Sequence, residues 1–294
     1  MSIRREMRSA ASAGANALPG GTAPLAAYLQ SQLTDEGGFA NKAGVSDLYY
    51  TVFGIQASLA VGLDLPVEQI VRYLQTFGDG TSLDLVHLSC LARCWADLPG
   101  VQLPDDRRGA IARTVRSYRS ADGGYSLVAG AGEGSVYGCF VAAGAMQDIG
   151  EPAGDPARIG RFLAGLQTPE GGYVNEPALP FAATPSTAAA LTLLANLGQP
   201  VPASGVDWLK RQRGKHGGWV AVPGAPVEDL LSTATALHAL AVSGADMHGE
   251  QEQAGAFVRS LQTPAGGFCA SHLDPSPDCE YTGYALVALG HTSR

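Results

Sequence analysis

The stretch Leu261-Gln262-Thr263-Pro264-Ala265-Gly266-Gly267-Phe268 holds two marks that recur along the chain. One is a glycine pair followed by an aromatic residue, and the other is the Leu-Gln-Thr triplet before it. The glycine pairs with their aromatics are Gly37-Gly38-Phe39, Gly123-Gly124-Tyr125, Gly171-Gly172-Tyr173, Gly217-Gly218-Trp219 and Gly266-Gly267-Phe268. Recurrence of two marks in one register indicates a repeat architecture.

The spacing of the glycine pairs predicts six repeats. Successive pairs lie 86, 48, 46 and 49 residues apart, and the first gap is two periods long, with a degenerate copy at Gly78-Asp79-Gly80. The triplet recurs at Leu74-Gln75-Thr76 and Leu166-Gln167-Thr168. Because the repeats fill nearly the whole chain, we expect one domain over residues 22–294 after a flexible leader at 1–21.

Composition narrows the class of protein. Of the 294 residues, 46% are hydrophobic and 16% are charged, which is enough apolar material for a large core. The net charge of −8 argues against binding to nucleic acid, which favours a basic surface. No apolar run approaches the length of a transmembrane helix, and the N-terminal region lacks the apolar run of a secretory signal. We therefore expect a cytoplasmic protein, whose five cysteines are buried free thiols.

Each period reads as two helices. The leading segments show apolar residues at helical spacing with polar residues between them, which is typical of helices with one wet face. These predicted outer helices cover residues 24–32, 67–77, 159–167, 206–212 and 254–262. The second segments are poorer in charge, which favours burial on most sides, and they cover 47–61, 85–96, 136–146, 186–197, 229–241 and 281–289. We expect the glycine pairs to cap the outer helices, and six helix pairs to close into an all-α, α6/α6 toroid with a central cavity.

Acidic residues recur near the start of the inner helices. They are Asp47, Asp84, Glu133, Asp229 and Asp278, and the fourth repeat has Ala183 instead. An aspartate at this place commonly caps free backbone N–H groups. Several carboxyl groups at one mouth of an apolar cavity would also raise the pKa of one or two of them, which would suit an acid catalyst. Both interpretations stand at this point.

Other polar and aromatic residues accompany these acids. Three residues after their repeat's acid lie Tyr50, His87, Ser232 and Tyr281, of which Tyr50 and His87 are candidates for acid–base or positioning roles. Aromatic residues form a second set, either as a cavity wall able to stabilise a carbocation or as plugs between repeats. This set comprises Phe39, Tyr49, Tyr125, Tyr137, Tyr173, Trp219, Phe268, Tyr281 and Tyr284.

The repeat over residues 24–291 resembles that of the prenyltransferase and squalene-cyclase family. Two stretches are similar to the β subunits of protein prenyltransferases, namely 208–212 with Gly217-Gly218-Trp219, and 37–51 with Lys42. The resemblance implies the α6/α6 toroid, an apolar funnel for an isoprenoid diphosphate, and a helical partner subunit. It also implies a zinc ion held by an Asp-x-Cys pair and a histidine.

The chain departs from that pattern at the implied metal and phosphate residues. The Asp-x-Cys place holds Asp229-Leu230-Leu231 in the fifth repeat and Asp278-Cys279-Glu280 in the sixth, and the histidine place holds Tyr50. The matched zinc ligands are thus absent, so we assign no metal-binding residues and expect no stoichiometric zinc, and zinc stays the one cofactor that the resemblance implies. Of the cations implied to bind diphosphate, only Lys42 lies at a matching place.

The repeat also resembles that of cyclases of the squalene-hopene type. The resemblance implies a reaction without metal, in which an Asp-x-Asp-Asp-Thr-Ala run protonates an alkene. The run Asp229-Leu230-Leu231-Ser232-Thr233-Ala234 keeps its first Asp, its Thr and its Ala. We expect a prenyltransferase-like enzyme for an isoprenoid or similar apolar substrate. The alternatives are a metal-free terpene cyclase or isomerase with Asp229 or Asp278 as its acid, and a non-catalytic subunit that binds a lipid or a protein.

The candidate residues follow from these interpretations. Asp47, Tyr50, Asp84, His87, Asp229 and Asp278 are the candidate catalytic or positioning groups. Lys42, Tyr49, Tyr125, Tyr137, Tyr173, Trp219, Phe268 and Tyr281 are the candidate substrate-binding groups.

Overall fold

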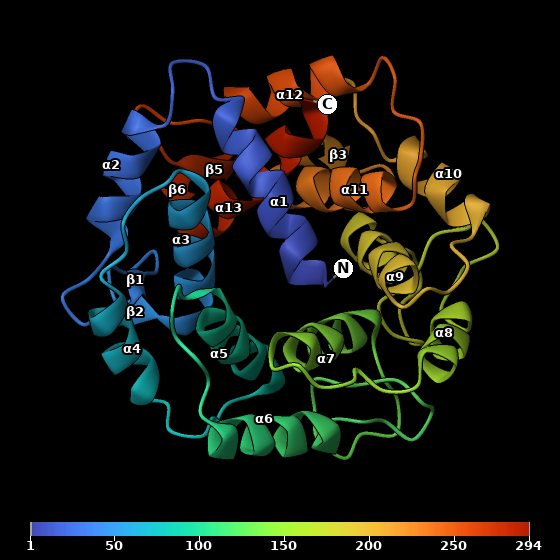
Figure 1. Ribbon diagram of the computed structural model, residues 1–294. Helices are drawn as coiled ribbons and strands as arrows, with labels where there is room; N and C mark the ends of the chain where they lie inside the picture. Colours follow the sequence, from blue (N-terminus) through green and yellow to red (C-terminus); the bar gives the residue numbers. More distant parts are fainter. Residues whose placement is uncertain (1, 294) are drawn as a thin grey trace.

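The computed structural model describes residues 2–293 and arranges twelve of their thirteen helices in two concentric rings (Figure 1). The inner ring consists of α3 (Leu48–Ala60), α5 (Leu85–Asp97), α7 (Val136–Asp148), α9 (Thr184–Asn196), α11 (Leu230–Val242) and α13 (Cys279–Thr292). The outer ring consists of α2 (Ala23–Gln32), α4 (Val67–Gln75), α6 (Asp105–Ser117), α8 (Pro156–Ala164), α10 (Ala203–Arg211) and α12 (Gln251–Ser260). Outer and inner helices alternate along the chain, which confirms the predicted α6/α6 toroid.

The polarity of each helix explains its ring. Inner helix α11 carries no Asp, Glu, Lys or Arg and buries residues on most of its sides, as an inner helix must. The outer helix α6 was missing from the predicted set because six of its thirteen residues are charged, which obscures its apolar stripe. Its buried side is short, with Ala110, Ile111, Ala112 and Val115 facing the inner ring.

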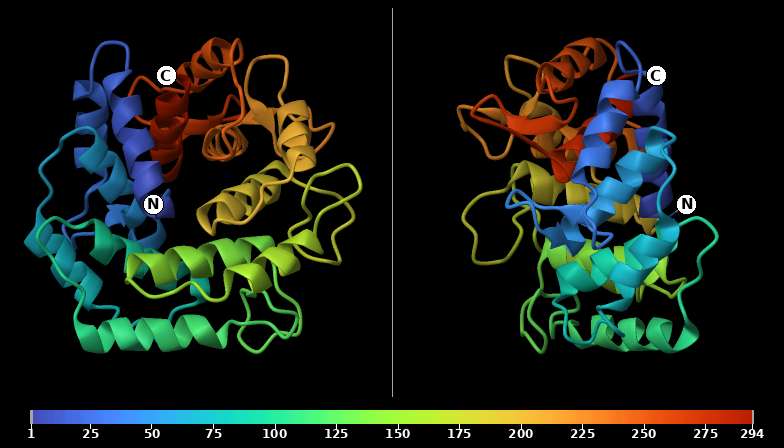
Figure 2. Two further views of the ribbon diagram at one scale, coloured as in Figure 1. Left: turned by 45° about the vertical axis from the view of Figure 1, so that its right-hand side comes forward. Right: turned by 90° about the vertical axis from the view of Figure 1, so that its left-hand side faces the viewer.

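Three short antiparallel ribbons connect glycine pairs to inner helices. They are β1 (Phe39–Ala40) with β2 (Ser46–Asp47), β3 (Trp219–Val220) with β4 (Glu228–Asp229), and β5 (Phe268–Ser271) with β6 (Asp274–Asp278). Their register pairs the aromatic after the glycine pair with the aspartate before the inner helix, as in Trp219 opposite Asp229. These ribbons project from one face of the toroid, and both ends of the chain lie toward the other (Figure 2).

The glycine pairs form contacts between repeats, and the predicted capping role is wrong. Helix α2 ends at Gln32, and Gly37 lies in a separate turn closed by its N–H on the carbonyl of Thr34. Gly37 has φ +97°, and a Cβ there would overlap the backbone carbonyl of Gln69 in α4. The first glycine of four pairs therefore lets one repeat touch the backbone of the next, whereas Gly123 lies against the side chain of Arg158.

The same contact closes the ring. Gly266 of the sixth repeat lies against the backbone of Pro24 in α2, and Gly267 lies against the ring of Tyr28. Helix α13 packs on α3, as neighbouring inner helices do elsewhere in the ring. The last repeat thus uses the first as its neighbour, so neither end of the array is left open.

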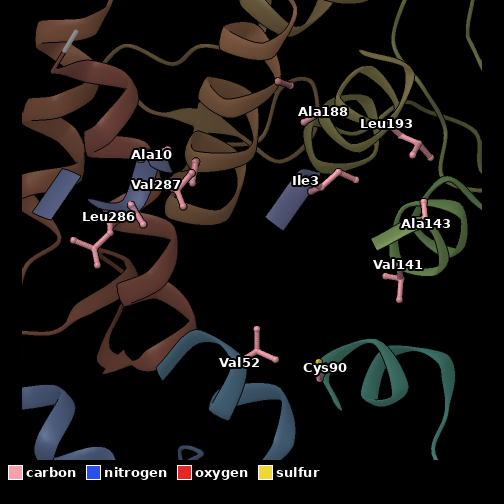
Figure 3. Packing of buried hydrophobic residues seen from close by; sticks show 14 of the residues in the cluster. Ile3, Ala10, Val52, Cys90, Val141, Ala143, Ala188, Leu193, Leu286 and Val287 are labelled. Atoms are coloured by element: carbon pink, nitrogen blue, oxygen red, sulfur yellow. The ribbon is translucent and has the colours of Figure 1, made fainter. Parts of the chain in front are cut away.

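The expected flexible leader is wrong over most of its length, since it contains helix α1 (Ile3–Asn16). This helix crosses the middle of the ring and packs mainly on α13 (Figure 1). Figure 3 shows Ala10 of α1 beside Leu286 and Val287 of α13. A Cβ on Gly14 would overlap the carbonyl of Leu286, so small residues allow the two helices to approach closely.

Ion pairs hold the start of α1 to the ends of two inner helices. Arg4 donates to Asp97 at 2.7 Å and to Asp148 at 2.9 Å, and both carboxylates are 1% exposed. Arg93 of α5 also donates to Asp148, at 3.0 Å. Buried carboxylates need such partners, so α1 completes the closed end of the toroid. No helix within residues 2–293 has both the length and the apolar character needed to span a bilayer.

Candidate functional site

The inner helices enclose a central cavity with two connected lobes of about 200 and 90 Å³. Both lobes are lined by Met7, Tyr49, Tyr137, Phe140 and Tyr284, and most of the remaining lining is apolar. Figure 3 shows some of the buried hydrophobic side chains around this space, among them Val52, Cys90 and Val141. Met7 belongs to α1, so this helix covers one end of the cavity.

One position of the repeat forms a ring of six side chains at the other end, the mouth. It is the second residue of each inner helix, and its members are Tyr49, Val86, Tyr137, Pro185, Leu231 and Glu280. Four residues further on lies a second ring, made of Phe53, Cys90, Val141, Ala189, Thr235 and Tyr284. The step of four residues keeps both rings on the helix faces that line the cavity.

The predicted acids lie two residues before the mouth ring and cap the inner helices. Asp47, Asp84, Asp229 and Asp278 each accept a backbone N–H from the first turn of their helix. In the third repeat Ser135 is the cap, and Glu133 lies exposed in the preceding loop. None of these carboxyl groups is among the described residues that line the cavity.

Two of these aspartates are nevertheless buried enough for their pKa values to be raised. Burial raises the pKa of Asp229 above its usual value, although Ser232 donates to it from its N–H and its hydroxyl. Burial also raises the pKa of Asp278, whose Oδ2 atom lies 3.7 Å from Lys42 Nζ. Both raised pKa values therefore belong to aspartates that end a β-ribbon and cap the inner helix after it.

The remaining candidate polar residues lie outside the cavity. His87 Nδ1 is 2.9 Å from the Asp84 carboxylate, and both side chains are largely exposed. Lys42 donates to Asp274 at 2.7 Å and lies 5.7 Å from the centre of the Tyr281 ring. Tyr50 is partly buried beside Tyr49, and the two rings are nearly perpendicular with their centres 5.8 Å apart.

The aromatic candidates other than Tyr281, which lies beside Lys42, separate into two groups. Tyr49, Tyr137 and Tyr284 line the cavity. The aromatics after the glycine pairs are instead fully buried between the two rings of helices, so they plug the repeats and do not wall the cavity. They are Phe39, Tyr125, Tyr173, Trp219 and Phe268.

Glu280 is the carboxyl group that the mouth ring places against the cavity, and the sequence interpretation missed it. The Tyr49 hydroxyl donates to its Oε1 atom at 2.7 Å. Burial raises the pKa of Glu280, and the nearby Asp278 adds to this rise, whereas the Tyr49 hydrogen bond opposes it. A partly buried carboxyl group with a raised pKa retains its proton more readily, as a general acid requires.

A signal for Glu280 was present in the sequence. The run Asp278-Cys279-Glu280-Tyr281-Thr282 has an acid two residues after its first aspartate and a threonine two residues after that acid. This is the spacing sought in the fifth repeat, where Leu231 takes the central place. His238, also on the cavity wall, lacked any comparable signal because it lies deep within an otherwise apolar helix.

The residues at the implied zinc places do not fit a zinc centre. Leu231 faces the cavity, Asp229 caps α11, and the Cys279 thiol is fully buried, which raises its pKa. Across residues 2–293, no three His, Cys, Asp or Glu side chains gather closely enough to hold a metal ion. The zinc implied by the resemblance therefore has no suitable set of ligands here.

The loops around the mouth expose large apolar side chains. Val45, Leu127, Val128, Leu179, Phe181 and Leu273 all lie between a glycine pair and the inner helix that follows it. We call these six residues the apolar rim. Exposed apolar side chains near the entrance of an apolar cavity are typical of proteins that bind a hydrophobic ligand or dock on a protein or membrane surface.

Comparison with known proteins agrees with this architecture. The family model described as "Prenyltransferase alpha-alpha toroid domain" matches residues 85–198 and 186–292. A search of curated protein sequences found no match.

Solved structures share the fold at low sequence identity. Protein geranylgeranyltransferase-I from Candida albicans, complexed with GGPP, is 15% identical, with a TM-score of 0.60 over 98% of this chain and 90% of its own. A variant of the type II terpene cyclase MstE from Scytonema, in complex with geranylgeranyl dihydroxybenzoate, is 14% identical, with a TM-score of 0.62 over 99% and 98%. A protein from Actinoplanes is 17% identical, with a TM-score of 0.63 over 98% and 100%.

Proposed function

The chain belongs to the prenyltransferase alpha-alpha toroid family, and we propose that it is an enzyme that cyclises or isomerises an isoprenoid chain. The reaction starts when an acid in the cavity protonates an alkene. The observation that carries this proposal is the placement of Glu280 in the mouth ring, with a raised pKa and a hydrogen bond from Tyr49.

The proposed substrate class rests on the cavity and on the relatives. An apolar cavity lined by Phe140, Tyr137 and Tyr284 suits a hydrocarbon chain. Two proteins of similar fold were solved with GGPP and with geranylgeranyl dihydroxybenzoate, which supports an isoprenoid ligand for this chain.

The proposed first step uses Glu280 in its protonated form. Tyr49 donates to Oε1, which leaves Oε2 to carry the acid proton. The alkene π pair takes this proton to form a C–H bond, the O–H electrons stay on the carboxylate, and the adjacent carbon becomes a cation. The faces of Tyr137, Phe140 and Tyr284 stabilise that cation. A carbon next to the cation, either directly or after attack by a second alkene has moved the cation, then gives a proton back to the Glu280 carboxylate, and its C–H electron pair forms the new alkene of a product that is an isomer of the substrate.

Charges at the mouth favour a substrate without a diphosphate group. Lys42, the cation that matches the diphosphate pattern, is bound by Asp274 at 2.7 Å and lies near Asp278. Glu280 and Asp278 would repel a diphosphate at this entrance when they are ionised. This distribution supports cyclisation or isomerisation over transfer from an isoprenoid diphosphate.

Deuterium incorporation tests the proposed chemistry. Geraniol, farnesol, geranylgeraniol and geranylgeranyl diphosphate are incubated with the protein in D₂O, and products are analysed by mass spectrometry. We expect an isomeric product with deuterium at the protonated carbon. Glu280→Gln should lower turnover by roughly a hundredfold or more while the fold survives, because the amide cannot donate the proton.

Asp229→Asn is the control for this experiment. Asparagine accepts the same capping hydrogen bond, so stability should change by about 1 kcal/mol or less and turnover should remain. Isomerisation without deuterium uptake, or an unchanged rate in Glu280→Gln, would refute proton-initiated chemistry at Glu280.

The apolar rim supports one other function, a non-catalytic subunit that binds a lipid or a helical partner protein. Its six side chains are exposed on loops that lead into four of the inner helices, where either partner would dock. Tight binding of prenyl alcohols with no product from any of the four probes would favour this alternative. A cytoplasmic location remains part of the proposal, and the five buried free thiols support it.

A further inference from the structure

His238 lies on the cavity wall, deep below the mouth. It shares one face of α11 with Leu231, Ala234 and Thr235, at the helical spacing of three, four and seven residues. The side chain is 4% exposed. Seven residues separate it from Leu231 of the mouth ring, which places it about 10 Å deeper at 1.5 Å per residue.

One nitrogen of His238 has a partner and the other has none. Its Nδ1 lies 3.0 Å from Nε2 of His291, whereas its own Nε2 is buried without a hydrogen-bond partner among residues 2–293. Burial lowers the pKa of His238 to about 4, so the ring is neutral at pH 7. A buried polar atom left unpaired is costly, and proteins retain few of them.

Two other polar side chains at the same depth are paired. Arg93 and Gln56 occupy the equivalent position on α5 and α3, seven residues after the mouth ring. Arg93 donates to Asp148, and Gln56 donates to Asp97. His238 differs from both because the residue lines the cavity and its Nε2 atom has no hydrogen-bond partner within residues 2–293.

We propose that His238 forms a hydroxyl-binding subsite at the deep end of the cavity, and that the natural ligand is an oxygenated isoprenoid. The hydroxyl group of the ligand occupies this subsite while its reacting alkene lies at Glu280. This orientation rests on the proposed function, whereas the subsite itself concerns binding alone.

The chemistry of a neutral imidazole selects the hydroxyl group. If Nδ1 donates to His291, then Nε2 carries a lone pair and needs a donor, and in the other tautomer Nε2 carries the proton and needs an acceptor. A hydroxyl group satisfies either tautomer, because it both donates and accepts. A hydrocarbon satisfies neither tautomer. Met7 of α1 lines the same cavity and covers its deep end.

Paired ligands test the subsite. The affinities of geraniol, farnesol and geranylgeraniol are compared, by isothermal titration calorimetry, with those of the hydrocarbons that lack only the hydroxyl group. The wild type should bind at least one alcohol about tenfold more tightly than its hydrocarbon. In ¹⁵N-histidine-labelled protein, the alcohol should shift the Nε2 resonance of His238 and the hydrocarbon should not.

Two substitutions make the test specific. His238→Leu should remove the preference for the alcohol and retain hydrocarbon binding, and His238→Gln, which keeps a polar group, should retain part of the preference. Thermal melting checks that each variant folds. Equal affinities for alcohol and hydrocarbon in the wild type, or a preference that survives in folded His238→Leu, would overturn the subsite.

Glu280→Gln separates this inference from the proposed function. It should keep the alcohol preference and lose turnover, since the two side chains lie at opposite ends of the cavity. An alcohol preference that depends on His238, together with an absence of catalysis in every variant, would leave the subsite standing and remove the proposed reaction.

Discussion

At the scale of single residues, a threonine connects four of the five plugging aromatics to their inner helices. In the fifth repeat the Thr233 hydroxyl accepts from the Trp219 N–H at 2.9 Å and donates to the Asp229 carbonyl at 2.7 Å. In three other repeats the backbone N–H of the aromatic likewise donates to a threonine hydroxyl. The pairs are Phe39 with Thr51, Tyr173 with Thr187, and Phe268 with Thr282. The third repeat uses the Cys139 sulfur, 3.2 Å from the Tyr125 nitrogen.

Thr233→Val tests this connection. Valine has nearly the same shape but leaves the buried N–H of Trp219 unpaired, so the free energy of unfolding should fall by about 1–3 kcal/mol. Urea denaturation measures the change. Thr235→Val in the same helix is the control, because that hydroxyl donates only to carbonyls of its own helix and should matter less. Equal losses in both variants would contradict the special role of Thr233.

The raised pKa of Glu280 predicts how activity and stability depend on pH. Turnover should be full below the folded-state pKa and fall as the pH rises through it, because the acid must be protonated. The folded protein also binds this proton more tightly than the unfolded chain, whose pKa is near 4.5. Stability from Glu280 is therefore present below that value and lost as the pH rises through the folded-state pKa.

Glu280→Gln should reduce this slope of stability against pH, which denaturation at a series of pH values measures. A residual slope of the same sign should remain, because burial also raises the pKa of Asp229 and Asp278. A variant with the wild-type slope would show that Glu280 titrates normally in the folded protein.

In four inner helices, the acid singled out from the sequence lies two residues before the position that lines the cavity. The aspartates were visible because capping places them at the same point of several repeats, as at Asp47 and Asp229. Which residue of the first turn faces the cavity depends on how the helix is rotated in the ring, and that rotation is set by tertiary packing. Tyr49 and Tyr137, which line the cavity, belong to the aromatic set that the sequence predicts, whereas Glu280 falls in the stretch that matches the metal pattern.

At the scale of elements, the glycine pair connects neighbouring repeats through two contacts. Gly217 has φ +100°, and a Cβ there would overlap the backbone carbonyl of Gln253 in α12. Gly218 lies against the ring of Phe257 in the same helix. The six repeats were predictable because these contacts need glycine at fixed spacing. Helix α6 was not predictable, since it binds the ring with few apolar residues.

Gly217→Ala should destabilise the protein through both its backbone angle and its overlap. Gly244→Ala is the matched control, because Gly244 has φ +68° and open space at its Cβ position. Gly244→Ala should lower the free energy of unfolding by about 1 kcal/mol, because alanine is strained at a positive φ. Gly217→Ala should cost about 1–3 kcal/mol more, as measured by chemical denaturation. Similar losses in the two variants would mean that the contact with α12 contributes little.

At the scale of the whole molecule, α1 closes one end of the ring of inner helices and leaves the cavity open at the mouth. The ring has its mouth at the start of the inner helices, and α1 covers the other end with Met7 toward the cavity. Sequence alone did not show this, because α1 is rich in alanine and polar residues and its main packing partner, α13, lies at the far end of the chain. A spacing of four was the available sign, with Ala10 and Gly14 facing Leu286 and Gly290.

Gly290→Ala tests whether α1 is an integral part of the toroid. A Cβ on Gly290 would overlap the carbonyl of Ala10, which is backbone and cannot move aside without shifting α1. We expect the free energy of unfolding to fall by about 1–3 kcal/mol, and residues 3–16 to become sensitive to limited proteolysis. Gly109→Ala is the control, because this glycine lies inside α6 with only the far end of Arg113 nearby, so alanine should be neutral or slightly stabilising. If Gly290→Ala matched Gly109→Ala in stability and in resistance to protease, α1 would not be packed against α13. The deep end of the cavity, on which the His238 subsite depends, would then be open to water.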